Sequence, residues 1–304
     1  MPGLSRREFL GGTVGLAAAV ALPLSGSSRA AAITPLAGAT VNKDTYSGAT
    51  SYVDAAQILD GYVGMPLGTT IQKIYLQPGV FPASPGTKMT QLSGAGCQFV
   101  ISVVPSLQKT SSQQTSLANY LAMITNAGIS YRVVLYSEAN NRAFTSRSLW
   151  QEYWSYYAPV IQDAGISLGY CPGCTAGSIY RAEEFFPSDP TPDEVWLDFY
   201  ATSFRGGTRI DDLIALAGAA GVPVGLAEWG WYSGELGLDP MTMPVWTLYC
   251  DYLAHLGTAG DFGLGAIYFD ITPVGHNLEA NTIGSASDPR IPGLQKVYAA
   301  IQSA

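Results

Sequence analysis

Short runs rich in β-branched and aromatic residues alternate with longer helical stretches along most of this 304-residue chain. This alternation constrains the fold more than any other feature, because it is typical of parallel βα units and not of a β-sandwich. We expect eight strands, near residues 38–42, 71–77, 98–106, 131–136, 166–171, 194–201, 223–228 and 264–272. Eight such units predict an α/β fold of the closed (β/α)8 barrel (TIM barrel) type.

The stretches between these runs carry apolar residues at helical spacing. Helices are expected near 52–62, 209–220, 244–256 and 292–302, around Leu117, Leu121 and Ile124, and from Trp150 to Ile161. Three helix-to-strand joints place a glycine just past the helix, at Gly128, Gly165 and Gly221, where a left-handed cap is easiest. The long loops after strands one, two and five lie on the side where such barrels build their sites.

The first 32 residues have the layout of an export signal. Arg6 and Arg7, in "SRREFL", resemble a twin-arginine signal, and an apolar stretch from Thr13 to Leu24 leads to an alanine run that ends at Ala32. The apolar stretch is shorter than the ~20 residues that span a bilayer. We therefore expect a twin-arginine signal peptide at 1–32, a barrel domain at 33–304, and a secreted product in the extracellular space, periplasm or cell wall. The alternative is an uncleaved amphipathic anchor.

Composition narrows the partners of the expected mature domain. Loss of the signal removes three arginines and one glutamate, so the formal charge of −8 becomes −10. Binding to nucleic acid needs clustered Lys and Arg, so a nucleic-acid partner is excluded. Charged residues are only 12% of the chain and aromatics 11%, which suits a neutral substrate. Nothing in the sequence requires more than a monomer, and no stable membrane insertion is expected once the signal is cleaved.

Two of the four cysteines lie close together, Cys171 and Cys174 in "CPGC". A redox dithiol or half of a zinc site would also fit this spacing. Outside the cytoplasm, a local disulfide is the favoured interpretation.

Two glutamates end predicted strands, Glu138 in "VVLYSEANN" and Glu228 in "VPVGLAEWGW". Catalytic groups of (β/α)8 enzymes stand at the C-terminal ends of strands. By period two, Val134, Tyr136 and Glu138 share one face of strand four, and Val224, Leu226 and Glu228 share one face of strand seven. Two carboxylates facing each other across the barrel mouth are the groups that cleave a glycosidic bond.

At this point the sequence resembles the large clan of retaining (β/α)8 glycoside hydrolases, clan A, with an acid/base Glu after strand four and a nucleophile Glu after strand seven. Within the clan, "EVWLDFYA" followed by "VPVGLAEWGW" is most similar to the mannanase and lichenase type, family twenty-six. The resemblance covers the mature chain as architecture and is sharp at strands four, six and seven. It implies Glu138 as acid/base, Glu228 as nucleophile and Tyr200 as the aromatic beside the nucleophile.

One position departs from the family pattern. Members of the clan carry Asn, or His in the mannanase type, just before the acid/base Glu, and here that position is Ser137. A serine can lose a hydrogen bond that strengthens in the transition state. Further residues that we expect to contact substrate are the neighbouring amides, three aromatics after strand seven and a histidine after strand eight: Asn140, Asn141, Trp229, Trp231, Tyr232 and His276. Asp198 and Asp270, also near strand ends, are interpreted as supporting residues.

The sequence therefore predicts an enzyme, a secreted glycosidase that cleaves β-linked polysaccharide or oligosaccharide by a retaining double displacement. That mechanism needs no metal or organic cofactor, and it predicts a carboxyl separation of roughly 5 to 5.5 Å. The alternative is a non-catalytic carbohydrate-binding or cell-wall-associated barrel. A phosphate-handling barrel is disfavoured, because "EWGWYSGELG" is glycine-rich but acidic.

Overall fold

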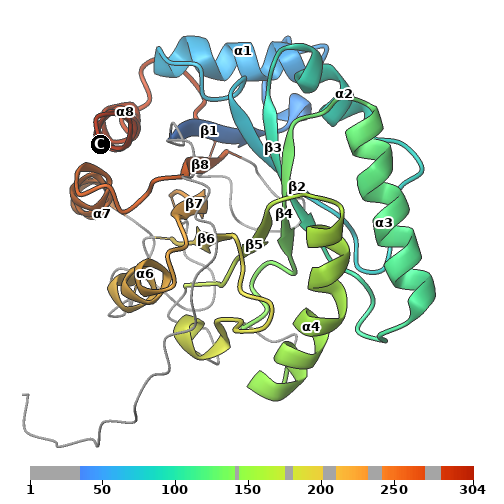
Figure 1. The fold of residues 1–304 in the computed structure, drawn as a ribbon. Coiled ribbons are helices and arrows are strands. Elements are labelled where there is room, and N and C mark those ends of the chain that lie inside the picture. Colours follow the sequence, from blue (N-terminus) through green and yellow to red (C-terminus); the bar gives the residue numbers. More distant parts are fainter. Residues whose placement is uncertain (1–34, 141–143, 175–180, 201–209, 232–241, 271–281) are drawn as a thin grey trace, which may run out of the picture. The chain divides into compact units, whose positions relative to one another are not determined.

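In the computed structural model, the described residues are 35–140, 144–174, 181–200, 210–231, 242–270 and 282–304. They contain one sheet of eight strands in the order β1-β8-β7-β6-β5-β4-β3-β2, every ladder being parallel. The strands are β1 Leu36–Val41, β2 Ile71–Tyr75, β3 Gln98–Val103, β4 Tyr131–Leu135, β5 Leu168–Tyr170, β6 Glu194–Asp198, β7 Val224–Trp229 and β8 Gly265–Asp270. The predicted (β/α)8 fold is confirmed, and Figure 1 shows the ring of helices around these strands.

The barrel closes between β1 and β2 through side chains as well as by close packing. The backbone N–H of Lys73 donates to Thr40 Oγ1 at 3.1 Å, and that of Val41 donates to Gln72 Oε1 at 3.3 Å. Gly38 permits this approach, because a Cβ there would stand 2.2 Å from the carbonyl oxygen of Ile71. The two strands can approach this closely only because position 38 is a glycine.

Seven α-helices lie between or after the strands in the described part of the chain: α1 Tyr52–Val63, α2 Gly86–Gly94, α3 Ser111–Asn126, α4 Arg147–Asp163, α6 Ile210–Ala219, α7 Met243–Thr258 and α8 Ile291–Gln302. α2 was not expected, because the segment after β2 is rich in Pro and Gly. Between β5 and β6 the described residues form the 3-10 turn η2, Ala182–Phe185, and no α-helix. No helix in the described ranges is both long and apolar enough to cross a bilayer. The predicted left-handed glycines have φ of 69° at Gly128, 70° at Gly165 and 71° at Gly221.

Two apolar layers hold the barrel together. The larger one fills the space between strands and helices, and the smaller one fills the barrel interior: Ile71, Val100, Val134, Cys171, Trp196, Ala227, Leu264 and Ile267. Near the N-terminal ends of the strands, Arg132 pairs with Glu194 at 2.8 Å, and the Trp196 indole N–H donates to the same carboxylate at 2.8 Å. The barrel interior is thus filled near the N-terminal ends of the strands, which leaves the C-terminal ends of the strands as the place for a site.

Candidate active site

The C-terminal ends of β4, β5, β6 and β7 are joined by backbone hydrogen bonds that continue past the strands. The Glu138 N–H donates to the carbonyl of Cys171 at 2.7 Å, and Asp198 N–H to Pro172 at 3.2 Å. The Phe199 N–H donates to the Glu228 carbonyl at 2.8 Å. Both predicted glutamates therefore belong to one continuous backbone frame, which fixes their positions before any ligand arrives.

Glu138 lies in a segment of unusual backbone geometry. Tyr136 and Glu138 have φ of 56° and 57°, the left-handed region that side chains larger than Asn rarely adopt. Such residues cost about 1–3 kcal/mol each and cluster at functional sites. The prediction that Tyr136 shares a face with Val134 is wrong: Val134 lies inside the barrel, while Tyr136 packs on Phe144 and Tyr153 in the outer layer.

Glu228 reaches the mouth by a bulge in β7, and not by regular alternation. Against β6, Leu226 pairs with Leu197 but Glu228 pairs with Asp198, so Ala227 is an extra residue. Leu226 lies in the outer layer and Ala227 in the barrel interior. The prediction that Val224, Leu226 and Glu228 share an inward face is therefore wrong. Glu228 departs from the alternation of the two apolar residues because of the bulge.

Three donors hold the Glu228 carboxylate. Oε1 accepts from the Lys73 ammonium at 2.6 Å and from the Tyr75 hydroxyl, and Oε2 accepts from the Tyr200 hydroxyl at 2.7 Å. The Glu228 side chain is 12% exposed. Burial opposes ionisation of this carboxyl, but Lys73 and the two tyrosine hydroxyls outweigh burial, so the pKa of Glu228 lies below its usual value. Glu228 is thus held as an anion with a small exposed surface.

Lys73 is itself fully buried and is shared with a second carboxylate. Its Nζ lies 2.8 Å from Asp198 Oδ1, 3.0 Å from Oδ2 and 3.6 Å from Cys171 Sγ. Burial would lower the pKa of Lys73, but Asp198, Cys171 and Glu228 outweigh it and hold that pKa well above its usual value. Burial raises the pKa of Asp198, and the charges of Glu228 and Glu138 add to this against Lys73. The two glutamates act on one electrostatic site.

Two residues beside Glu138 bond to the protein itself. The Ser137 hydroxyl donates to Ser102 Oγ at 2.8 Å. Asn140 is fully buried, and its carboxamide exchanges two 2.8 Å hydrogen bonds with the backbone of Gly173. Asn140 therefore ties the loop after β4 to the loop after β5, which is a structural role in place of the expected contact with substrate.

The aromatic residues after β7 separate into two environments. Trp229 is fully buried in the outer layer, stacked on Trp246 at 5.9 Å, so its ring is not available to a sugar and the expected substrate contact is corrected. Trp231 is half-buried beside Trp246 and Arg290, at the edge of a hollow of about 310 Å3. Tyr200 bonds directly to Glu228, as the resemblance implied.

Some predicted residues lie outside the described residues. These are Asn141, Tyr232 and His276, together with the side chain of Asp270. Cys171 and Cys174 are described, and both thiols are free, so the expected disulfide is wrong. Cys171 points into the barrel interior, while Cys174 packs against the outer layer, which separates the two sulfurs.

Lys73 and Tyr75 are site residues that the sequence analysis did not identify. Tyr75 leaves 44% of its surface exposed while its hydroxyl donates to Glu228, so an aromatic ring is presented to solvent directly beside the carboxylate. The available signal was "IQKIYLQ", in which a lysine interrupts a strand run at a position that faces inward with Ile71. A buried lysine needs a partner anion, and the sequence alone does not show which one.

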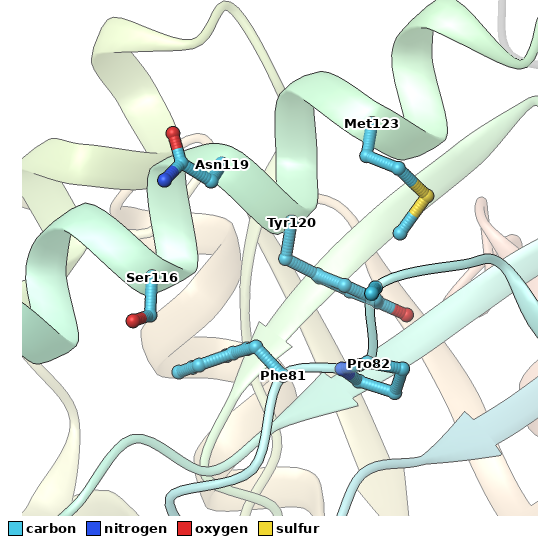
Figure 2. Close-up of a pocket in the computed structure, with 7 residues that line it drawn as sticks. Phe81, Pro82, Ser116, Asn119, Tyr120 and Met123 are labelled. Carbon is cyan, nitrogen blue, oxygen red and sulfur yellow. The ribbon is translucent and has the colours of Figure 1, made fainter.

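A cavity of about 330 Å3 lies away from this cluster, between the segment after β2 and helix α3. Figure 2 shows Phe81 and Pro82 on that segment facing Ser116, Asn119 and Tyr120 on the helix. Neither glutamate lines this cavity. The candidate active site is therefore the cluster around Glu228 and the Glu138 segment.

No protein-family model matches the chain, and no curated protein sequence matches it. Similar solved structures exist at low identity. YdhT from Bacillus subtilis is 16% identical, with 78% of this chain and 80% of that chain covered and a TM-score of 0.52. The catalytic domain of a family 26 endo-β-1,4-mannanase from Bacillus sp. JAMB-750 is 14% identical, with 88% and 86% covered and a TM-score of 0.52. Gas2p from Saccharomyces cerevisiae, in complex with laminaritetraose and laminaripentaose, is 12% identical, with 87% and 63% covered and a TM-score of 0.53. The structural neighbours include (β/α)8 glycoside hydrolases, and this chain has their fold.

Proposed function

We propose that this protein is an exported glycoside hydrolase that cleaves β-linked polysaccharide or oligosaccharide with retention of configuration. Glu228 is the nucleophile and Glu138 the acid/base. The proposal depends mainly on the hydrogen bonds of Glu228. This carboxylate is nearly buried at the end of β7 and accepts from one ammonium and two phenols. A carboxylate that only solubilised a strand end would not need three buried or aromatic donors.

The acceptor pattern of Glu228 assigns its reacting atom. Each carboxylate oxygen has about two acceptor positions. Oε1 fills both with Lys73 and Tyr75, whereas Oε2 accepts from Tyr200 alone among the described residues. Oε2 therefore keeps a lone pair for the anomeric carbon, and Oε1 anchors the group.

The reaction then has two balanced steps. Glu228 Oε2 bonds to the anomeric carbon as the glycosidic C–O bond breaks, and Glu138 gives its proton to the leaving oxygen. Water next attacks the same carbon, Glu138 takes a proton from it, and the bond to Glu228 breaks. The ring of Tyr75, which is partly exposed beside Glu228, is the described aromatic that we assign to stacking against the sugar.

The substrate class is also a proposal. The similar structures include an endo-β-1,4-mannanase and a protein bound to laminari-oligosaccharides. We therefore propose to test β-1,4-mannan and β-1,3-glucan first. The acidic chain, with a formal charge of −8, favours neutral polysaccharides over acidic ones.

A second candidate function is a barrel that binds glycans without cutting them. The geometry of Ser137 favours it, because this hydroxyl is committed to Ser102 at the position that the resemblance assigns to Asn or His. Without that side chain, a transition-state hydrogen bond to the sugar is missing.

Hydrolysis of mannan, β-1,3-glucan, mixed-linkage glucan, xylan and cellulose by the mature protein tests the proposal. Glu138→Gln and Glu228→Gln are assayed beside it, with Glu152→Gln as the matched control, since Glu152 lies on the surface of α4 in an exposed pair with Lys109. We expect Glu138→Gln to lower kcat by ~10²–10⁴-fold, the contribution of a general acid, and Glu228→Gln to lower it more. The control keeps wild-type activity.

Two other outcomes point elsewhere. Glycan binding without cleavage by the wild type supports the binding barrel. Unchanged cleavage by Glu228→Gln, with native circular dichroism, contradicts the assignment of the nucleophile. The stereochemistry of the first product, read by proton NMR, separates retention from inversion.

Export by the twin-arginine route is proposed from residues 1–32 and is tested separately. Replacing Arg6 and Arg7 by lysine in the full chain is expected to keep the protein in the cytoplasm of a bacterial host. Normal export of that variant contradicts the signal.

A further inference from the structure

The Lys73 ammonium is the only described cation within hydrogen-bonding distance of Glu228, and it is divided between two carboxylates. It contacts both oxygens of Asp198, at 2.8 and 3.0 Å, and one oxygen of Glu228, at 2.6 Å. Lys73 and Asp198 are fully buried, so water does not screen this arrangement. Asp198 and Glu228 therefore share one ammonium, and a change in the charge of Asp198 alters how strongly Lys73 holds Glu228.

We propose that Asp198 is a positioning residue for Glu228 that acts through Lys73, fixing the ammonium against Oε1 and withdrawing part of its charge from the carboxylate. The inference rests on the proposed function of Glu228. A carboxylate that faces an unshared ammonium is strongly stabilised as an anion and is a weaker nucleophile. Lys73 keeps Glu228 ionised, and Asp198 keeps the ionised carboxylate reactive.

Burial raises the pKa of Asp198, but the contacts of both its oxygens with the Lys73 ammonium favour the ionised form. Both of its oxygens accept from Lys73, whereas a protonated carboxyl would offer an O–H donor. The backbone of the same residue is fixed, because its N–H donates to Pro172 and its carbonyl accepts from Cys174 N–H at 2.9 Å. Asp198 thus holds the Lys73 ammonium in a fixed position.

Several titratable groups face Glu228 from the surrounding elements, and the test must separate them. In the described part of the chain they are Lys73 and Tyr75 from β2, Cys171 after β5, and Asp198 and Tyr200 from β6 and its end, while the charge of Glu138 after β4 acts on Asp198. Only Lys73 and Asp198 are fully buried and paired with each other. Changing these two gives shifts of opposite sign, which no single neighbour would produce.

The test is a carbon-13 NMR titration of carboxylates in the mature protein, with the Glu228 signal assigned by its loss in Glu228→Gln. In Asp198→Asn, which keeps the shape of the side chain, the Lys73 charge acts on Glu228 alone. We expect the pKa of Glu228 to fall by about 1. In Lys73→Met, we expect it to rise by about 1 to 3, because burial then acts unopposed.

Kinetics add a second readout. If the protein cleaves glycans, the acid limb of kcat/KM against pH moves down in Asp198→Asn and up in Lys73→Met, and kcat falls roughly tenfold or more in both. Lys73→Arg, which keeps the charge, should restore the position of the acid limb. A fall in kcat with an unmoved acid limb would indicate a purely structural role for Asp198.

The titration does not depend on activity, so the two proposals fail separately. If the wild type cleaves no glycan, the proposed hydrolase function is wrong. The pKa of Glu228 in the variants still tests whether Asp198 acts on Glu228 through Lys73. An unchanged or raised pKa of Glu228 in folded Asp198→Asn overturns the inference. Should Lys73→Met fail to fold, the comparison of Asp198→Asn with wild type still decides the sign.

Discussion

Trp229 tests whether the aromatic residues after β7 serve the core or the substrate. The ring is fully buried, stacked on Trp246 and in edge contact with Tyr268 at 5.4 Å and Tyr298 at 5.7 Å. Truncating a buried tryptophan to alanine costs about 3–5 kcal/mol of unfolding free energy. We therefore expect Trp229→Ala to lose about that much, measured by urea denaturation followed by circular dichroism, with glycan binding retained wherever the variant is folded.

Trp229→Phe sharpens this prediction, because two effects oppose each other. The smaller ring loses part of the packing, but the indole N–H has no hydrogen-bond partner among the described residues. Removing an unpaired buried donor returns about 1–3 kcal/mol. We expect Trp229→Phe to lie within about 1 kcal/mol of wild type, since phenylalanine keeps the ring contacts.

Trp231→Ala is the matched control, since Trp231 is half-buried at the edge of a hollow. It should lose less stability than Trp229→Ala and more glycan affinity. The reasoning is refuted if Trp229→Ala keeps wild-type stability but no longer binds glycan, because the ring would then have to reach the mouth.

Two further predictions concern stability. The folded pKa of Glu228 lies below its reference value of 4.5, so its contribution to stability is full above that pH and is lost as pH falls through the folded pKa. Lys73→Met reverses the sign of this pH dependence. The raised pKa of Glu228 makes the variant lose stability as pH rises above about 4.5, with a deficit of about 3–5 kcal/mol at pH 7 for the unpaired buried charge. Equal urea midpoints for the variant and the wild type at pH 7 would contradict this. Gly38→Ala should lower the free energy of unfolding by about 1–3 kcal/mol, because the new Cβ meets the Ile71 carbonyl. Gly218→Ala, on the open surface of helix α6, should raise it by about 0.5–1 kcal/mol. Thermal melts of the two variants compare these effects.

The fold was predictable because strand and helix signals are local. β-Branched runs such as 131–136 and aromatic stripes such as Trp150 to Ile161 decide their own conformation and burial. Strand ends were predicted too long, for example 194–201 against an observed end at Asp198, since the aromatic residues directly beyond it favour strand in a sequence pattern but lie outside the strand. α2 was missed, because "GTKMTQLSG" carries only two buried apolar residues, Met89 and Leu92.

The partners of the site could not be read in the same way. Lys73 meets Asp198 across 125 residues and Glu228 across 155, and no local pattern encodes such a pairing. The free thiols have a similar cause: the expected export of the protein favoured a disulfide in "CPGC", but Cys171, just after β5, lies in the barrel interior. The tertiary position of each side chain therefore decided its role.

Both glutamates lie where their strands depart from the strand period, and this has a physical reason. Regular alternation sends a side chain either into the packed barrel interior or into the layer under the helices, and both places are apolar. A carboxylate in either would be buried without access to a ligand. The extra residue Ala227 in β7 takes Glu228 out of this alternation, and the left-handed conformation of Tyr136 and Glu138 ends the alternation after β4. Strain of this kind persists only where the surroundings over-determine it, and the backbone bonds from Glu138 to Cys171 and from Phe199 to Glu228 are what fix it here. The irregular backbone thus orients the polar side chains of the site. A sequence pattern that assumes regular strands identifies these residues but does not predict their orientation.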